Sequence, residues 1–215
     1  MKFTTRVAAV LAFSGFISSA TAADVVLEAA APYNWTGFYA GGQVGYHWGQ
    51  LDFVDCVGLC PTDPDIEGAG LAIQAGYDHQ FSNDVVLGGF ISVPLSGPEG
   101  SFELGRGLEF TYEPKYAFIA GARLGYAMGG ILPYVTAGYV LTKVEVTSPF
   151  DTTDSNTHHG YRIGFGTEFM VTEHLSVDLR YIYNQLDRKP YDFGGGVSRW
   201  SHDGSTISTS INWRF

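Results

Sequence analysis

The sequence predicts an all-β protein, an eight-stranded antiparallel transmembrane β-barrel with short turns at one end and long loops at the other. Three observations lead to this prediction. Eight segments alternate apolar with polar or small residues, the connections between them alternate in length, and the chain begins with a segment typical of exported proteins. Strands with this alternation suit a barrel that faces lipid on the outside and a polar interior on the inside.

The first 22 residues have the parts of a secretory signal peptide. Lys2 and Arg6 form a basic start, an apolar run follows, and Ala20-Thr21-Ala22 is a small-residue cleavage site. The apolar run is too short for a membrane anchor, which is the weaker alternative. We predict cleavage after Ala22 or one residue later, which divides the chain into a signal peptide (1–22), a periplasmic segment (23–34) and a barrel (35–215).

The mature chain is strongly acidic. The full sequence has 12 Lys and Arg against 22 Asp and Glu, and removal of two basic residues with the signal peptide gives 10 − 22 = −12. Phosphate binding needs clustered basic side chains, so nucleic acid is not an expected partner. No later segment has the roughly 18 consecutive apolar residues of a membrane helix, so a membrane protein of this sequence must cross with strands.

The first predicted strand lies in the run WTGFYAGGQVGYHW, which starts at Trp35. Phe38, Val44 and Tyr46 share one face, and small or polar residues such as Gln43 share the other. The same alternation recurs in seven further segments, at 71–78, 85–93, 117–126, 135–142, 161–169, 175–184 and 206–215. Each can supply the roughly 9–11 residues that a tilted strand needs to cross a bilayer.

The connections between these segments alternate between short and long. Short turns at 82–84, 128–131 and 172–174 alternate with long polar connections at Gly49–Gly68, Ser96–Tyr112, Thr147–His158 and Leu186–Ser201. Transmembrane barrels have short periplasmic turns and long extracellular loops, whereas a soluble sandwich has no reason for this alternation. With an even strand number, both termini are expected in the periplasm. Aromatic residues near both ends of the strands are typical of the two membrane interfaces.

The predicted interior carries charges of both signs, at Asp78, Arg123, Arg162, Glu168, Asp178 and Arg180. The interior of an eight-stranded barrel is just wide enough to be filled by side chains. Because an unpaired buried charge is costly, we predict that these groups pair and plug the lumen. A narrow water or ion path is the alternative.

Histidines and cysteines in the outer connections are candidates for binding and cross-linking. His47, His158, His159 and His202 lie toward the outer end, where imidazoles near aromatic side chains are candidate haem ligands, although solvated surface histidines are the plainer interpretation. Apart from haem, no cofactor is predicted. Cys56 and Cys60 lie in the first long connection, and export to an oxidising compartment favours a disulfide between them.

Neither a metal site nor an active site is predicted. Asp63, Asp65 and Glu67 alternate in the first long connection, but they lack a full calcium-ligand loop and are better read as a solvated acidic surface. His202 stands beside Asp203, yet no nucleophile with a matched base and orienting group is evident. The sequence therefore predicts no enzyme.

Three stretches resemble a known family. WTGFYAGGQVGY, RLGYAMGGILPYVTAGY and ISTSINWRF resemble the small outer-membrane β-barrel proteins of alphaproteobacteria, often labelled porin-family or surface-antigen proteins. The similarity runs from about Trp35 to Phe215, and the family in turn resembles the transmembrane half of outer-membrane protein A. The ending with Trp213 and Phe215 resembles the signal read by the barrel-assembly machinery.

The resemblance implies a protein of the Gram-negative outer membrane. Some relatives are described as haem-binding and others as abundant structural antigens. We expect a structural or surface-interaction protein that contributes to envelope integrity and presents extracellular loops, with ligand binding and a narrow channel as alternatives. Its expected partners are outer-membrane lipid, lipopolysaccharide and the assembly machinery, and a monomer is expected. With no residue after Phe215, a peptidoglycan-binding domain is not expected.

Overall fold

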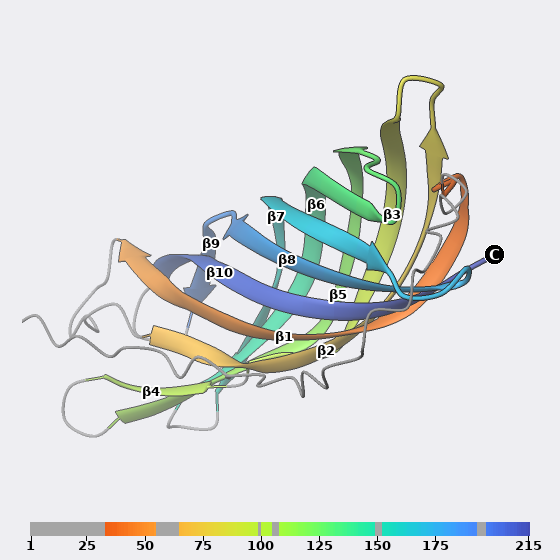
Figure 1. Cartoon of the computed structure of the whole chain (residues 1–215). Coiled ribbons are helices and arrows are strands. Elements are labelled where there is room, and N and C mark those ends of the chain that lie inside the picture. The colour runs from red at the N-terminus through yellow and green to blue at the C-terminus, as the bar shows by residue number, and fades with distance from the viewer. Residues whose placement is uncertain (1–32, 55–64, 99, 105–107, 149–151, 193–196) are drawn as a thin grey trace, which may run out of the picture. The chain divides into compact units, whose positions relative to one another are not determined.

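A computed structural model of the chain describes residues 33–54, 65–98, 100–104, 108–148, 152–192 and 197–215, whose secondary-structure elements are all strands (Figure 1). The strands are β1 (Gly37–Val54), β2 (Asp65–Gln80), β3 (Val85–Ser96), β4 (Gly100–Leu104), β5 (Leu108–Tyr126), β6 (Ile131–Thr147), β7 (Thr153–Met170), β8 (Leu175–Leu186), β9 (Lys189–Asp192) and β10 (Val197–Arg214). The predicted signal peptide and the predicted Cys56–Cys60 disulfide lie outside the described residues. Within the described ranges, no helix is long and apolar enough to cross a membrane.

Eight strands close into one antiparallel barrel. Their order is β1-β2-β3-β5-β6-β7-β8-β10, and β10 returns to pair with β1 from Tyr39↔Arg214 to Val54↔Arg199. Closure pairs the two edges that an open sheet would expose. The short strands β4 and β9 pair with β5 and β10 respectively. The predicted eight-stranded antiparallel barrel is therefore confirmed.

The two faces of the barrel match the alternation in the sequence. Phe38 on the outer face is 66% exposed, whereas Tyr39, the next residue in β1, is 3% exposed and points inward. Large apolar side chains are exposed in this way on all eight barrel strands, and we call them the apolar band. Exposed aromatic residues bound the band at both ends, at Phe38, Tyr77, Tyr126, Phe169 and Trp213 toward one end and at Trp48, Tyr116, Phe118 and Tyr161 toward the other. Such rows are expected at the two interfaces of a membrane.

Three tight turns mark one end of the barrel, which we call the inner end. The β2–β3 turn contains Asp84 and the β5–β6 turn contains Gly129, both with φ of 64°. Trp35 is fully buried at this end. Its backbone N–H donates to Gln80 Oε1 (2.9 Å), and its indole Nε1–H donates to the Gly129 carbonyl (3.0 Å). Trp35, two residues before β1, therefore fills the inner mouth of the barrel, and the C-terminus lies at the same end, where the Phe215 N–H donates to the Phe38 carbonyl (3.0 Å) (Figure 1).

The connections at the opposite, outer end are shorter than predicted, because the strands continue beyond the apolar band. Parts of the predicted loops 49–68, 96–112, 147–158 and 186–201 belong to strands, including all of β4 and β9. Within the band the apolar residues of each strand face outward and the polar or small residues face inward. In the outer strand segments beyond the band, apolar residues face inward instead. They form a buried outer hydrophobic cluster of Leu51, Ile66, Tyr112, Val144, Val146, Tyr191 and Trp200. Strand pairing satisfies the backbone polar groups of these segments, while the cluster buries their side chains, as in a soluble β-protein.

Candidate functional site

A charge cluster of Asp78, Arg123, Glu168 and Arg214 fills the inner half of the lumen, and none of the four side chains is more than 4% exposed. Arg123 donates from Nε to Asp78 Oδ1 (2.8 Å) and from Nη1 to Glu168 Oε2 (2.7 Å). Arg214 donates from Nη2 to Asp78 Oδ2 (2.5 Å) and from Nη1 to Glu168 Oε1 (3.2 Å). Each carboxylate thus lies between two guanidinium groups, an arrangement in which the four buried charges compensate one another.

Neutral groups complete the cluster. Asn212 Nδ2 donates to Glu168 Oε1 (3.0 Å), and the Ser176 hydroxyl donates to the same carboxylate oxygen. The Tyr39 ring lies 4.7 Å from the Arg123 guanidinium carbon and 5.2 Å from that of Arg214. These contacts fill the space around the ions, so the inner half of the lumen is packed with side chains.

A second buried pair lies next to the cluster, between Asp178 and Arg180. Arg180 Nε donates to Asp178 Oδ2 (2.7 Å), and the Tyr134 hydroxyl donates to Asp178 Oδ1 (2.7 Å). Ser210 adds a hydrogen bond to Asp178 Oδ2 (3.1 Å). The structure thus brings five of the six predicted lumen charges into two ion-paired groups.

Arg162, the sixth, lies apart from both groups. It is 7% exposed, its Nε has no hydrogen-bond partner, and no carboxylate of the described residues forms an ion pair with it. Its inward position on β7 follows the alternation of the strand as predicted, but the predicted pairing with a lumen carboxylate is not found among the described residues. Arg214, which the alternation of β10 also predicts on the inward face with Ser210 and Asn212, is a central member of the charge cluster.

Side chains pack so closely around Gly88 in β3 that we expect any added side-chain atom there to destabilise the protein. A Cβ at this position would overlap Asp78 Oδ1 and lie 3.2 Å from Arg123 Cγ. We expect Gly88→Ala to lower the free energy of unfolding by about 1–3 kcal/mol, because overpacking here displaces an ion pair. The matched control is Gly42→Ala on the outer face, where a Cβ meets nothing within 4 Å. Urea unfolding of both variants in lipid vesicles checks the prediction, and equal midpoints would contradict it.

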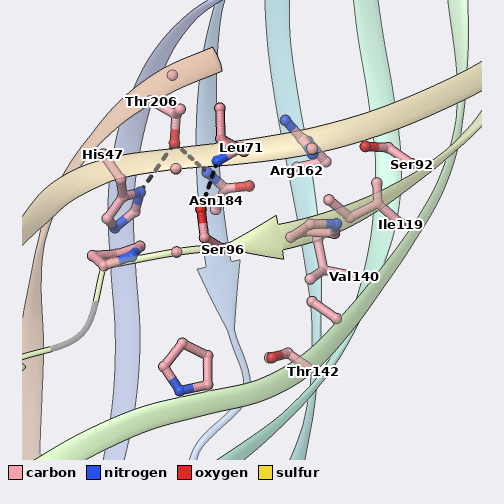
Figure 2. Close-up of a pocket in the computed structure, with 18 of the residues that line it drawn as sticks. His47, Leu71, Ser92, Ser96, Ile119, Val140, Thr142, Arg162, Asn184 and Thr206 are labelled. Atoms are coloured by element: carbon pink, nitrogen blue, oxygen red, sulfur yellow. Dashed lines mark hydrogen bonds between the residues drawn. The ribbon is translucent and has the colours of Figure 1, made fainter. Parts of the chain in front are cut away.

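A cavity of about 220 Å³ lies in the outer half of the lumen, and Figure 2 shows side chains that line it. Ile119, Val140 and Leu186 give it an apolar wall. Arg162 and Asn184 are among its polar lining groups, and both are residues of the inward faces of β7 and β8. The cavity thus combines an apolar wall with a buried cation that pairs with no carboxylate among the described residues.

The four candidate histidines do not form one site. His47 and His202 line the cavity together, with their Nε2 atoms 2.9 Å apart. His158 is buried under the outer hydrophobic cluster, where its Nε2 contacts the Tyr191 hydroxyl (2.8 Å). His159 is exposed on the opposite face of β7 and contacts Tyr139. Within the ranges that the structure describes, no group of three or more His, Cys, Asp or Glu side chains is placed to hold a metal ion.

The pKa values of the buried histidines follow from their surroundings. His202 lies beyond the apolar band, and burial, with His47 and His158 adding to the effect, lowers its pKa to about 3. Burial also lowers the pKa of His158. Both imidazoles are therefore neutral at pH 7, the form in which histidine ligates metals.

The two residues of the predicted assembly signal lie at the inner end. Trp213 and Phe215 are both exposed, and the Trp213 ring stacks on His174 with centroids 5.5 Å apart. Trp213 pairs with Ala40 of β1 and Leu175 of β8 at the seam where the barrel closes. The end of the chain therefore presents two exposed aromatic side chains, one in β10 and one directly after it.

Comparison with known proteins agrees with this architecture. A family model described as outer membrane protein beta-barrel domain matches residues 8–215. A 22 kDa outer membrane protein of Rhizobium leguminosarum is 30% identical over 85% of this chain and 79% of its own length. A 25 kDa outer-membrane immunogenic protein of Brucella abortus is 28% identical over 97% of this chain and 95% of its own.

Solved structures show the same fold at low sequence identity. Neisserial surface protein A has a TM-score of 0.53 at 17% identity, with 84% of this chain and 98% of that chain covered. Ail of Yersinia pestis, in complex with a heparin analogue, has a TM-score of 0.51 at 17% identity, covering 83% and 99%. The closed eight-stranded barrel, its apolar band and the family match lead to one conclusion: the chain belongs to the outer membrane protein β-barrel domain family, and its place is the bacterial outer membrane.

Proposed function

We propose that the protein is a structural, surface-interaction component of the outer membrane that contributes to envelope integrity and presents its outer hairpins outside the cell. The carrying observation is that the lumen is filled at its inner half by the charge cluster and covered at its outer end by the outer hydrophobic cluster. A barrel whose lumen is closed in this way interacts with its partners through its outer face and its outer hairpins, not through the lumen. Curated relatives named as immunogenic outer-membrane proteins support a role for exposed segments.

The proposed partners follow from these surfaces. The apolar band contacts outer-membrane lipid. The acidic outer segment with Asp65 and Glu67 is suited to divalent-cation bridges with lipopolysaccharide. The terminal aromatic residues of β10 are proposed to engage the barrel-assembly machinery. We propose a monomer without enzymatic activity, and the Cys56–Cys60 disulfide stays a prediction.

A cellular experiment tests this function. We expect a strain without the gene to be more sensitive to detergent and to chelators, and the intact protein to restore resistance. A variant without residues 100–111, a stretch that includes β4 and the start of β5, should restore resistance but lose binding of antibodies raised against that stretch. Unchanged sensitivity of the deletion strain would contradict the envelope role.

We propose that the inner end of the barrel faces the periplasm and the outer end faces the outside of the cell, which can be tested separately. Asn83 lies in the inner-end β2–β3 turn, and exposed Ser155 lies in the outer part of β7. In a chain with Cys56 and Cys60 replaced by Ser, we expect a membrane-impermeant maleimide to label Ser155→Cys in intact cells. Asn83→Cys should be labelled only after the outer membrane is permeabilised. The reverse pattern would place the termini outside the cell.

The charge cluster also bears on the channel alternative. Because Asp78, Arg123, Glu168 and Arg214 pack the lumen, we expect no steady conductance when the protein is inserted in a planar bilayer. A steady conductance that changes when Arg123 is neutralised would favour a channel over a closed barrel.

Haem binding is the second candidate function, and the observation that favours it is the His47–His202 pair. The cavity of about 220 Å³ is smaller than the roughly 300–1,000 Å³ of pockets for drug-sized ligands, and the two Nε2 atoms contact each other at 2.9 Å, so haem would bind with His47 as its ligand in place of the His47–His202 contact. A haem titration should give a Soret shift that is lost in His47→Ala and kept in His159→Ala, the control on the outer face. A titration without a shift would remove this candidate.

A further inference from the structure

The barrel wall is interrupted between β3 and β5. Their ladder ends at Ser92↔Ile119, and β5 is paired again on this side only from Tyr112, which pairs with Gly100 of β4. Residues 93–96 of β3 and 113–118 of β5 therefore have no ladder partners across this boundary. We call this interruption the side window.

Proline explains why the ladder stops here. Pro94 in β3 and Pro114 in β5 have no N–H to donate, and a proline within a sheet is confined to edges and irregular positions. The β2–β3 pairing also shifts at Leu71/Ala72, and the β5–β6 pairing shifts at Pro114/Tyr116. The side window is thus encoded in the strands on both of its sides.

The side window opens at the level of lipid. The apolar side chains around it are exposed on the outer face of the barrel, at Leu71, Val93, Leu95, Tyr116 and Phe118. They form the outer end of the apolar band, and Tyr116 and Phe118 belong to the aromatic row that bounds the band there. A molecule that enters here comes from the outer part of the bilayer, not from water.

The lumen cavity lies directly behind the side window. Its lining includes Pro94 and Pro114 from the two interrupted strands, and Leu71, which is 53% exposed on the lipid side. Figure 2 draws Leu71 and Ser96 with the inward-facing residues Arg162, Ile119 and Val140 around the same cavity. The cavity therefore reaches from the lumen to the barrel wall.

Arg162 determines which ligand chemistry suits this cavity. Its guanidinium is buried, its Nε has no partner, and no carboxylate of the described chain pairs with it. An unpaired buried charge is unfavourable, and an anion in the cavity would offset this cost. Ile119 and Val140 beside it favour an alkyl chain.

We propose that the cavity binds a single-chain aliphatic carboxylate from the membrane, with the carboxylate on Arg162 and the alkyl chain directed through the side window into lipid. The ligand is a monoanion with one chain because the cavity offers one buried cation and little volume. Guanidinium and carboxylate match in charge and in planar geometry. This site goes beyond the proposed envelope function and does not depend on it.

Binding is tested with decanoate labelled with ¹³C at the carboxyl carbon, added to the protein in phosphatidylcholine nanodiscs. We expect a bound carboxyl resonance for the intact protein and affinity weaker by about tenfold to a hundredfold in Arg162→Gln, because a charge-assisted contact is lost. Arg162→Lys should restore part of the affinity, which a merely structural role of the side chain would not predict. The matched control is Arg188→Gln, which removes an exposed arginine between β8 and β9. No bound resonance, or equal affinity of Arg162→Gln and the intact protein, would overturn the site.

The route is tested by linking the two sides of the side window. Continued pairing would place Val93 opposite Phe118, and both side chains are exposed on the lipid side and do not line the cavity. We expect Val93→Cys/Phe118→Cys, with Cys56 and Cys60 replaced by Ser, to take up decanoate normally when unlinked and slowly when joined by a short bis-maleimide. Ile91→Cys/Ala120→Cys is the matched control, because it joins the same strands where they are already paired. Equal uptake by the linked and unlinked forms of the first variant would overturn the lipid route.

Discussion

Replacing Arg123 with Met is expected to lower the free energy of unfolding by about 3–5 kcal/mol, the cost of removing one partner from a buried ion pair. Arg123 donates to both Asp78 and Glu168. Without it, two buried carboxylates share the single guanidinium of Arg214, and one negative charge is left uncompensated. The effect is large because the groups are almost fully removed from water.

Urea unfolding of the folded barrel in lipid vesicles measures this effect. The control is Lys115→Gln, which removes an exposed ion pair with Glu113 and Glu145 in the outer part of β5 and β6. Exposed pairs contribute about 0–1 kcal/mol, so this variant should unfold close to the intact protein. If Arg123→Met were as stable as Lys115→Gln, the charge cluster would not support the barrel.

Leu179→Arg is expected to destabilise the barrel by about 2–4 kcal/mol, because Arg would lie on the lipid face near the bilayer midplane. Leu179 in β8 is exposed on the outer face. It lies between Leu175, which pairs with Trp213 of β10 at the inner end, and Tyr183 toward the outer end. The energetic cost comes from placing a guanidinium in hydrocarbon, since no protein contact is removed from the lumen.

The same strand offers a control for this variant. Gln185 is exposed beyond Tyr183 at the outer end of β8, where an added Arg lies near the interface and should cost about 0–1 kcal/mol. Folding yield and urea midpoints in vesicles compare the two. A Leu179→Arg variant as stable as Gln185→Arg would mean that this face of β8 does not contact lipid.

The barrel itself was predictable from sequence because its main signals are local. Phe38 and Tyr39 take opposite faces of β1 for the same reason that any neighbouring strand residues do, and the spacing of short turns gives the number of strands. The inward face was assigned correctly at Asp78, Glu168 and Arg123 on the same grounds.

The outer hairpins and the partners within the lumen were not predictable in the same way. Beyond the apolar band, residues such as Leu51 and Tyr191 face inward, so the sense of the alternation changes and the segments read as loops. Partners in the lumen depend on the stagger between strands that are not neighbours in sequence. This stagger brings Arg214 of β10 to Asp78 of β2 and leaves Arg162 of β7 in the cavity.

Closure of the barrel between its first and last strands is the central claim, because the lumen, the charge cluster and the cavity all depend on it. Solid-state NMR of the protein in lipid bilayers tests it through cross-strand contacts between β1 and β10. The structure predicts contacts at Gly41↔Asn212, Gly45↔Ser208 and Gly49↔Gly204. Absence of these contacts, with the β1–β2 contact Gly45↔Gly70 still present, would show an open sheet and contradict the closed barrel.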